Sequence, residues 1–141
     1  MTQIFFYHNA ADRIAAAAAL IGKAFLHRKA LLVYAPDGEV AGMLDRHLWM
    51  HPPSGFLPHV RSTSPLADET PVVISDTLES LSHNERLFNL SAEIPPGFSR
   101  FTSVIEVVGR HEVERLAGRE RVKFYKDRGY AITYVDLAEN H

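Results

Sequence analysis

Basic side chains recur at helical spacing near the carboxyl end of the chain, and they are the residues best suited to bind a partner. Positions 110–128 contain seven Lys or Arg and four Asp or Glu, a local charge of +3, whereas the whole chain of 141 residues carries −2. At about 100° per residue, four of these cations fall within about 80° of one another around a helix. They are Arg115, Arg119, Lys123 and Lys126. Such a row can pair with carboxylates or phosphates.

An acidic peptide fits this row better than nucleic acid does. Nucleic acid usually requires more positive charge together with exposed aromatic side chains, and the residues outside positions 110–128 sum to −5. Val122 falls in the same arc of the helix and offers an apolar side chain beside the cations. Two alternatives stay open, namely a solvated charged helix without a partner and direct binding of single-stranded DNA.

The same helix carries apolar residues on a second face, roughly 100–200° from Arg115. They are Val113, Leu116, Ala117 and Phe124. We expect this second face to pack on a sheet and the basic row to face the partner.

Eight histidines and no cysteine make a metal site the next possibility to test. His47 and His51 are four residues apart and His59 is nearby, but no Glu follows His47 as in a zinc protease, and Pro52 ends the helix. We predict surface or interface histidines and no metal or other cofactor. The absence of cysteine excludes disulfides, thiol catalysis and Cys-ligated metals.

The carboxylates and serines give no catalytic site. Asp76, His83 and Glu85 could be combined on paper with a serine such as Ser75 or Ser82 into a triad, but no Gly-x-Ser-x-Gly turn supports it. Glu106 lies in an apolar segment and is predicted to be a paired structural carboxylate. No catalytic residue is assigned.

The elements that position these residues alternate between apolar strands and amphipathic helices. Strands are predicted at 3–7, 30–35, 71–74, 86–90, 103–108 and 131–137, and helices at 11–27, 39–50 and 111–127. This order predicts a single α/β domain over residues 1–141, with a mostly parallel central sheet flanked by helices. Asn9 or Asp12 is expected to cap the first helix, and Gly129 the last one in a left-handed conformation.

The turn after the first strand argues against a nucleotide site. It contains no glycine between His8 and Asp12, whereas a dinucleotide fold and a P-loop both need glycines there to bring the backbone close to phosphate. We therefore expect a Rossmann-like topology without a nucleotide-binding loop.

A second candidate interface lies in and before the proline-rich segment 51–71, which is predicted to be a long loop. Trp49, Phe56 and Leu57 are side chains of the kind that anchor protein–protein interfaces, although they could equally pack on their own core. No stretch is long and apolar enough for a membrane helix, and the first residues lack a basic export signal, so we expect a cytoplasmic protein.

Several segments, in this order and spacing, resemble the chi subunit family of bacterial DNA polymerase III. They are Phe5-Phe6-Tyr7, Leu48-Trp49, Phe56-Leu57-Pro58-His59, Pro71-Val72-Val73-Ile74, Asn89-Leu90 with Pro95 and Phe98, Glu106-Val107-Val108 and, most specifically, Arg119-Glu120-Arg121 with Lys123-Phe124-Tyr125-Lys126 and Gly129-Tyr130. The resemblance runs almost from end to end. Two positions depart from the family pattern: Val122 is often aromatic there, and Gly118 is usually Ala.

The resemblance implies a replisome-associated adaptor without intrinsic activity. Members of that family pair with the psi subunit of the clamp loader and hold the acidic C-terminal tail of single-stranded-DNA-binding protein, so that DNA is contacted indirectly. Trp49 and Phe56, with Leu57 beside them, match the psi-facing aromatics, whereas Arg115, Arg119 and Lys123 match the basic tail-binding helix. The alternatives are a small metal- or nucleotide-dependent enzyme on the same fold and a direct binder of single-stranded DNA.

Overall fold

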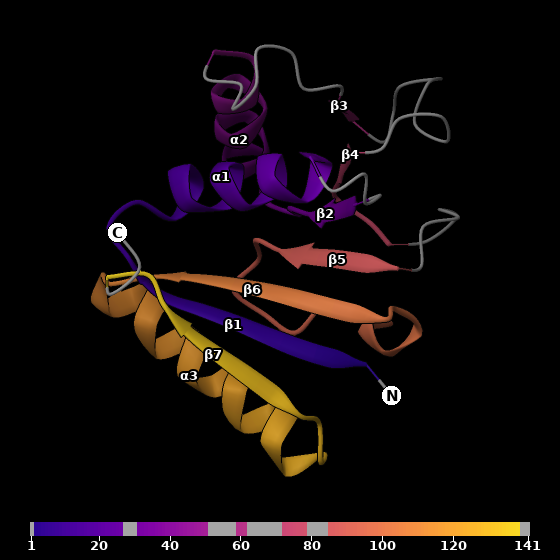
Figure 1. Ribbon diagram of the computed structural model, residues 1–141, viewed down its shortest axis with the longest axis vertical. Helices are drawn as coiled ribbons and strands as arrows, with labels where there is room; N and C mark the ends of the chain where they lie inside the picture. Colours follow the sequence, from indigo (N-terminus) through magenta and orange to yellow (C-terminus); the bar gives the residue numbers. More distant parts are fainter. Residues whose placement is uncertain (1, 27–30, 51–58, 62–71, 79–84, 139–141) are drawn as a thin grey trace.

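A seven-stranded sheet, all of whose strand pairs are parallel, forms the centre of the computed structural model (Figure 1). The structure describes residues 2–26, 31–50, 59–61, 72–78 and 85–138. Along the chain the elements are β1 (Gln3–Ala10), α1 (Arg13–Leu26), β2 (Leu31–Tyr34), α2 (Gly38–Met50), β3 (His59–Arg61), β4 (Val72–Ser75), β5 (Arg86–Asn89), the 3-10 helix η1 (Phe98–Arg100), β6 (Ser103–Gly109), α3 (Glu112–Asp127) and β7 (Ile132–Asp136). The strand order is β3-β4-β2-β5-β6-β1-β7.

The sheet is covered on both faces, which is why its central strands are apolar throughout. α1 and α2 pack together, with α1 against β6 and α2 against β4, whereas α3 packs against β6, β1 and β7 on the other face. Every residue of β4 and of β6 is buried. Alanines of α1 let that helix approach the sheet closely, with Ala17 fully buried and Ala18 nearly so. The layers leave α3 as the one long described helix on its face.

The predicted fold class is confirmed, and most predicted elements lie within a few residues of their observed positions. The segment 103–108 is a strand, as its β-branched residues indicated. The predicted loop 51–71 contains a short strand, β3, that the sequence analysis missed, because three residues are too few to show a periodicity. Among the described residues, no helix has both the length and the apolarity that crossing a bilayer requires.

Two predicted caps are also present. The Asp12 Oδ1 atom accepts hydrogen bonds from the backbone N–H groups of Ile14 and Ala15, at 3.0 and 3.2 Å, so Asp12 rather than Asn9 caps α1. Gly129 has φ of 80°, the left-handed conformation that ends α3.

Candidate functional site

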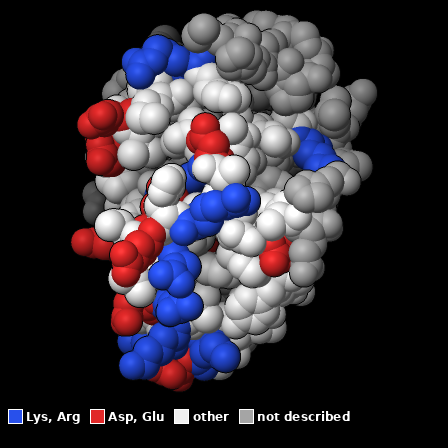
Figure 2. All heavy atoms as spheres, turned by 90° about the vertical axis from the view of Figure 1, so that its left-hand side faces the viewer, with Lys and Arg blue, Asp and Glu red and all other residues white. Residues whose placement is uncertain are grey.

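The basic row predicted on α3 is exposed to solvent. Arg115, Arg119, Lys123 and Lys126 all have exposed side chains. Figure 2 shows Lys and Arg as a column down the lower half of this face, with most of the acidic side chains gathered on one side of it. Because the column borders an area of uncharged surface on its other side, an anionic partner can approach the cations without meeting a parallel row of carboxylates.

A pocket of about 210 Å³ opens beside the amino-terminal half of α3. Arg115 and Arg119 reach it from α3, Phe6 and His8 from β1, and Val108 from β6; Asn9 and Arg110 complete its lining. The Phe6 ring stacks on His8, with the ring centroids 5.8 Å apart, and meets Tyr134 edge-on at 6.0 Å. The pocket therefore combines cations on one wall with an apolar and aromatic floor.

Next to the pocket, β1 has an irregularity at Asn9, and the polar groups around it are hydrogen-bonded to one another. Asn9 has φ of 65°, and the pairing of β1 with β6 shifts register between Tyr7 and Ala10. The Asn9 side-chain amide donates to the Asp136 carboxylate at 3.2 Å, and the Arg110 guanidinium donates to the Asn9 carbonyl at 3.4 Å. A hydrogen bond from the Ala138 backbone N–H, followed by the one from Asn9, lowers the pKa of Asp136. This carboxylate is thus held at the end of β7 by neighbours of its own chain.

The pocket contains residues that the sequence analysis did not assign to a site, namely Phe6, His8, Asn9 and Val108. Side chains alternate along a strand, which would have placed Phe6 and His8 on the same face of β1. Nothing in the sequence indicated which face of β1 α3 covers.

The predicted packing face of α3 is only partly right: Ala117 and Phe124 are half-buried, and the Phe124 ring packs on Phe98 and Tyr125, but the other two residues are exposed. Val113 is 83% exposed and Leu116 is 47% exposed, whereas the buried residues of the helix are Gly118, Arg121 and Tyr125. The buried residues are centred roughly a third of a turn around the helix from the expected face. The reason is that Arg121 and Tyr125 find buried hydrogen-bond partners on the sheet. These two polar side chains therefore face the sheet, although the hydrophobic pattern of the helix favoured its apolar face for that role.

Glu106 of β6 accepts the hydrogen bonds that hold α3 in this orientation. Its carboxylate receives the Arg121 Nε–H at 2.9 Å, the Tyr125 hydroxyl at 2.7 Å and the Asn89 amide at 2.9 Å. Burial, then the charge of Glu106, raises the pKa of Tyr125. The prediction that Glu106 is a paired structural carboxylate is confirmed.

The buried ion pair also corrects the charge of the segment 110–128. The Arg121 guanidinium is 3% exposed and is neutralised by Glu106, so it adds nothing to the surface charge. Six cations and four carboxylates remain, and one of those carboxylates, Glu114, accepts a hydrogen bond from the Gly109 N–H at 3.0 Å. The local excess that a partner meets is therefore +2 rather than +3, and it is concentrated in the row.

Gly118 lets α3 lie close enough to the sheet for this network to form. A Cβ atom at Gly118 would lie 2.8 Å from Val108 Cγ2 and 3.4 Å from the Phe6 ring. We expect Gly118→Ala to destabilise the protein by about 1–2 kcal/mol, because overpacking outweighs the gain of about 1 kcal/mol in helix propensity. Chemical denaturation measures it, with Ala117→Gly as the control for propensity alone. A more stable Gly118→Ala variant would contradict the close approach.

The other predicted residues of the row extend beyond the pocket. Lys123 and Lys126 lie one and two turns further along α3, and Val122 is half-buried between the row and the sheet. None of these three lines the pocket. The structure thus brings Arg115 and Arg119 together with an apolar floor and leaves Lys123 and Lys126 as an exposed continuation of the row.

Several predicted residues lie where the structure gives no side-chain description. Trp49 belongs to α2, but its side chain is not described, and Phe56 and Leu57 lie outside the described residues altogether. His51 also lies outside them, and the side chain of His59 in β3 is not described. Within the described part of the chain no group of three or more His, Asp or Glu side chains could hold a metal ion.

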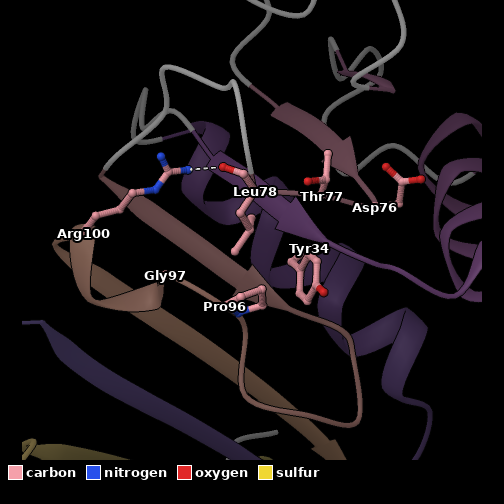
Figure 3. Close-up of a pocket in the computed structure, with 7 residues that line it drawn as sticks. All are labelled: Tyr34, Asp76, Thr77, Leu78, Pro96, Gly97 and Arg100. Carbon is pink, nitrogen blue, oxygen red and sulfur yellow. Dashed lines mark hydrogen bonds between the residues drawn. The ribbon is translucent and has the colours of Figure 1, made fainter.

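A larger pocket, of about 430 Å³, lies where β2 and β4 end (Figure 3). Carboxyl ends of parallel strands are the usual place for ligands in such sheets. Here Tyr34 lies beside Pro96, Asp76 follows β4, and the Arg100 guanidinium donates to the Leu78 carbonyl at 2.8 Å. Among the described lining residues the one cation, Arg100, already donates to a backbone carbonyl, so these residues offer little to a phosphate.

A crevice of about 600 Å³ opens at the carboxyl ends of β2 and β5, which are neighbours in the sheet. Asp37 and Glu93 line it, and the Arg13 guanidinium there donates to the carbonyls of Val107 and Ser91 at 2.7 and 3.0 Å. Burial, then the nearby Arg121, lowers the pKa of Arg13. With carboxylates in the lining and its arginine occupied, this crevice does not favour a nucleotide.

Comparison with known proteins gives a consistent result. The family described as "DNA polymerase III chi subunit, HolC" matches residues 1–133. The chain is 28% identical over 136 residues to DNA polymerase III subunit chi of Pseudomonas aeruginosa, covering 94% of each chain. It is 29% identical over 106 residues to the subunit of the same name in Haemophilus influenzae, covering 74% of each, and 28% identical over 105 residues to that of Escherichia coli, covering 74% of this chain and 71% of the relative. The chain therefore belongs to the chi subunit family of DNA polymerase III.

Proposed function

We propose that this protein is a non-catalytic adaptor that holds the acidic C-terminal tail of single-stranded-DNA-binding protein through α3. The pocket in which Arg115 and Arg119 meet Phe6 and Val108 is the observation that carries the proposal. A peptide that ends in a carboxylate and carries an aromatic ring needs both a cationic wall and an apolar floor, and the pocket has both.

In this proposal the pocket and the remainder of the row bind different parts of the tail. Arg115 and Arg119 would pair with the terminal carboxylate while the ring contacts the floor at Phe6. Lys123 and Lys126, exposed further along α3, would attract the acidic residues that precede the end of the tail. Attraction by exposed cations is screened by salt, so the complex should weaken as ionic strength rises.

The psi subunit is the second proposed partner, bound through Trp49, Phe56 and Leu57. Support comes from the family resemblance and from the position of Trp49 on α2, which packs on the opposite face of the sheet from α3. Two partners on opposite faces would not compete. Loss of psi co-purification by Trp49→Ala or Phe56→Ala, with tail binding intact, is the expected result; loss of both together would mean that the domain had unfolded.

Arg119→Ala is expected to weaken tail binding by roughly 10- to 150-fold, because a lost charged hydrogen bond costs about 1.5–3 kcal/mol. Titration of the full chain with the tail peptide in a calorimeter at low salt measures it. Arg46→Ala removes an equal charge from an exposed site on α2 and serves as the matched control. We expect that control to bind as tightly as the unaltered protein.

Direct DNA binding gives a different pattern in the same titration. It predicts affinity for a single-stranded oligonucleotide without the partner protein, with a steep dependence on salt. If the oligonucleotide binds as tightly as the tail peptide, or if Arg119→Ala leaves peptide affinity unchanged, tail binding by α3 is wrong.

A further inference from the structure

β7 ends the sheet and has one edge that no described strand covers. Its other edge pairs with β1: the Ile4 N–H donates to the Ala131 carbonyl at 3.1 Å, and the Leu137 N–H donates to the His8 carbonyl at 3.0 Å. Backbone groups alternate in direction along a strand. Residues 131, 133, 135 and 137 therefore face β1, and the N–H and C=O groups of Ile132, Tyr134 and Asp136 point to the open edge.

This edge lacks the features that usually prevent a strand from pairing further. Its sequence, Ile-Thr-Tyr-Val-Asp, is rich in strand-forming residues and contains no Lys and no Pro. Its register with β1 runs without a shift from Ile132 to Asp136. Tyr134 is half-exposed. A regular edge of this kind, whose one charged residue, Asp136, has its carboxylate bound by the Asn9 amide, is a template for an added strand.

The charged side chains near β7 indicate which kind of strand could bind at this edge. Arg121 points from α3 toward Glu106 of β6, and Gly118 faces Val108 of β6 and Phe6 of β1. Since Arg115 and Arg119 lie on the flank of the helix away from Arg121, they lie on the β7 side, where Phe6 meets Tyr134. A strand added to β7 would present every second side chain to these cations.

A second copy of this chain does not fit the edge. Pairing two β7 strands side by side would bring the cation rows of both copies toward the same junction, and like charges repel there. A strand with carboxylates at alternate positions gains from the same row. Charge complementarity thus favours an acidic segment over self-association.

We infer that the acidic tail binds as an extended strand added to the open edge of β7, with its backbone paired to Ile132, Tyr134 and Asp136 and its alternate side chains on the same side of the sheet as the cation row. This inference rests on the proposed function, since it takes the acidic tail as the occupant. It adds a geometry that the cation row alone does not require, because side chains could pair with arginines from any backbone conformation.

N-methylation of the peptide backbone tests the geometry. Each amide of the tail peptide is methylated in turn, and each peptide is titrated into the full chain at low salt. We expect an alternating pattern: methylation of every second amide weakens binding at least tenfold, whereas methylation of the intervening amides changes it by less than twofold. In parallel, amide hydrogen exchange measured by NMR should slow at residues 132, 134 and 136 when the unmodified peptide binds.

The outcomes separate the two proposals. If the unmodified peptide binds but methylation shows no alternation and those three amides gain no protection, the added strand is wrong and tail binding stands. If the unmodified peptide does not bind, both proposals are wrong. Protection of the same amides that rises with protein concentration, without peptide and together with dimerisation in sedimentation, would show a second copy on β7 and overturn the inference.

Discussion

Glu106→Gln is expected to lower the free energy of unfolding by roughly 3–5 kcal/mol, although the two side chains have nearly the same shape. The substitution leaves the Arg121 guanidinium, 3% exposed, without its counter-charge. Removing one member of a buried ion pair is costly because the remaining charge stays desolvated. Tyr125 and Asn89 would lose a charged acceptor as well. Urea denaturation followed by circular dichroism measures the change.

Two controls define the origin of this effect. Glu120→Gln removes an exposed carboxylate from α3 and should change stability by less than about 0.5 kcal/mol. The double variant Glu106→Leu with Arg121→Met removes both charges and should recover a large part of the loss. A cost for Glu106→Gln below about 1 kcal/mol would mean that the pair does not hold α3 to the sheet.

Phe6→Ala is the second substitution with a large expected effect, roughly 3–5 kcal/mol of stability. The Phe6 side chain is 7% exposed and lies under α3 opposite Gly118, with His8 and Tyr134 as aromatic neighbours. Truncation leaves a cavity at a place where the backbone of α3 already lies close, so the helix has little freedom to collapse into it. Thermal unfolding should show a lower midpoint.

The same substitution tests the pocket as well as the core. Because Phe6 forms the floor of the pocket, Phe6→Ala should weaken tail binding even at temperatures where the protein stays folded. Phe6→Leu keeps most of the buried volume and should cost less than about 1.5 kcal/mol. Full tail affinity in a folded Phe6→Ala variant would show that the ring of the ligand does not use this floor.

The order of strands and helices could be predicted because the strands are buried on both faces. Continuous apolar runs such as Leu31–Tyr34 and Val72–Ser75 then stand out from the amphipathic helices between them. β3 has only three residues and no such contrast. The order of strands in the sheet depends on pairings between distant residues, such as Gln3 with Ser103, which local patterns do not contain.

The site could be predicted only in part, because the apolar face of α3 is not the face that is most deeply buried against the sheet. The positions of Arg115 and Arg119 followed from spacing alone. Glu106 determines which face of α3 packs on the sheet, because this single carboxylate gives Arg121 and Tyr125 a buried hydrogen-bond partner. The floor of the pocket at Phe6 and Val108 comes from two strands that are about 100 residues apart in the chain. No periodicity within one segment shows that proximity.

The position of β1 in the sheet has a consequence for synthesis of the chain. β1 lies between β6 and β7, so the first strand to be made pairs with the last two. At about 5–20 residues per second, the apolar residues of β1 wait roughly 5–20 s for β6 to be translated. Pairings so distant in sequence also form slowly. A chain released before β6 would carry an unpaired apolar β1 and would also lack α3. β1 is therefore covered, and the cation row completed, at almost the same point of synthesis. Incomplete chains would expose β1, an apolar surface of the kind that chaperones and proteases recognise.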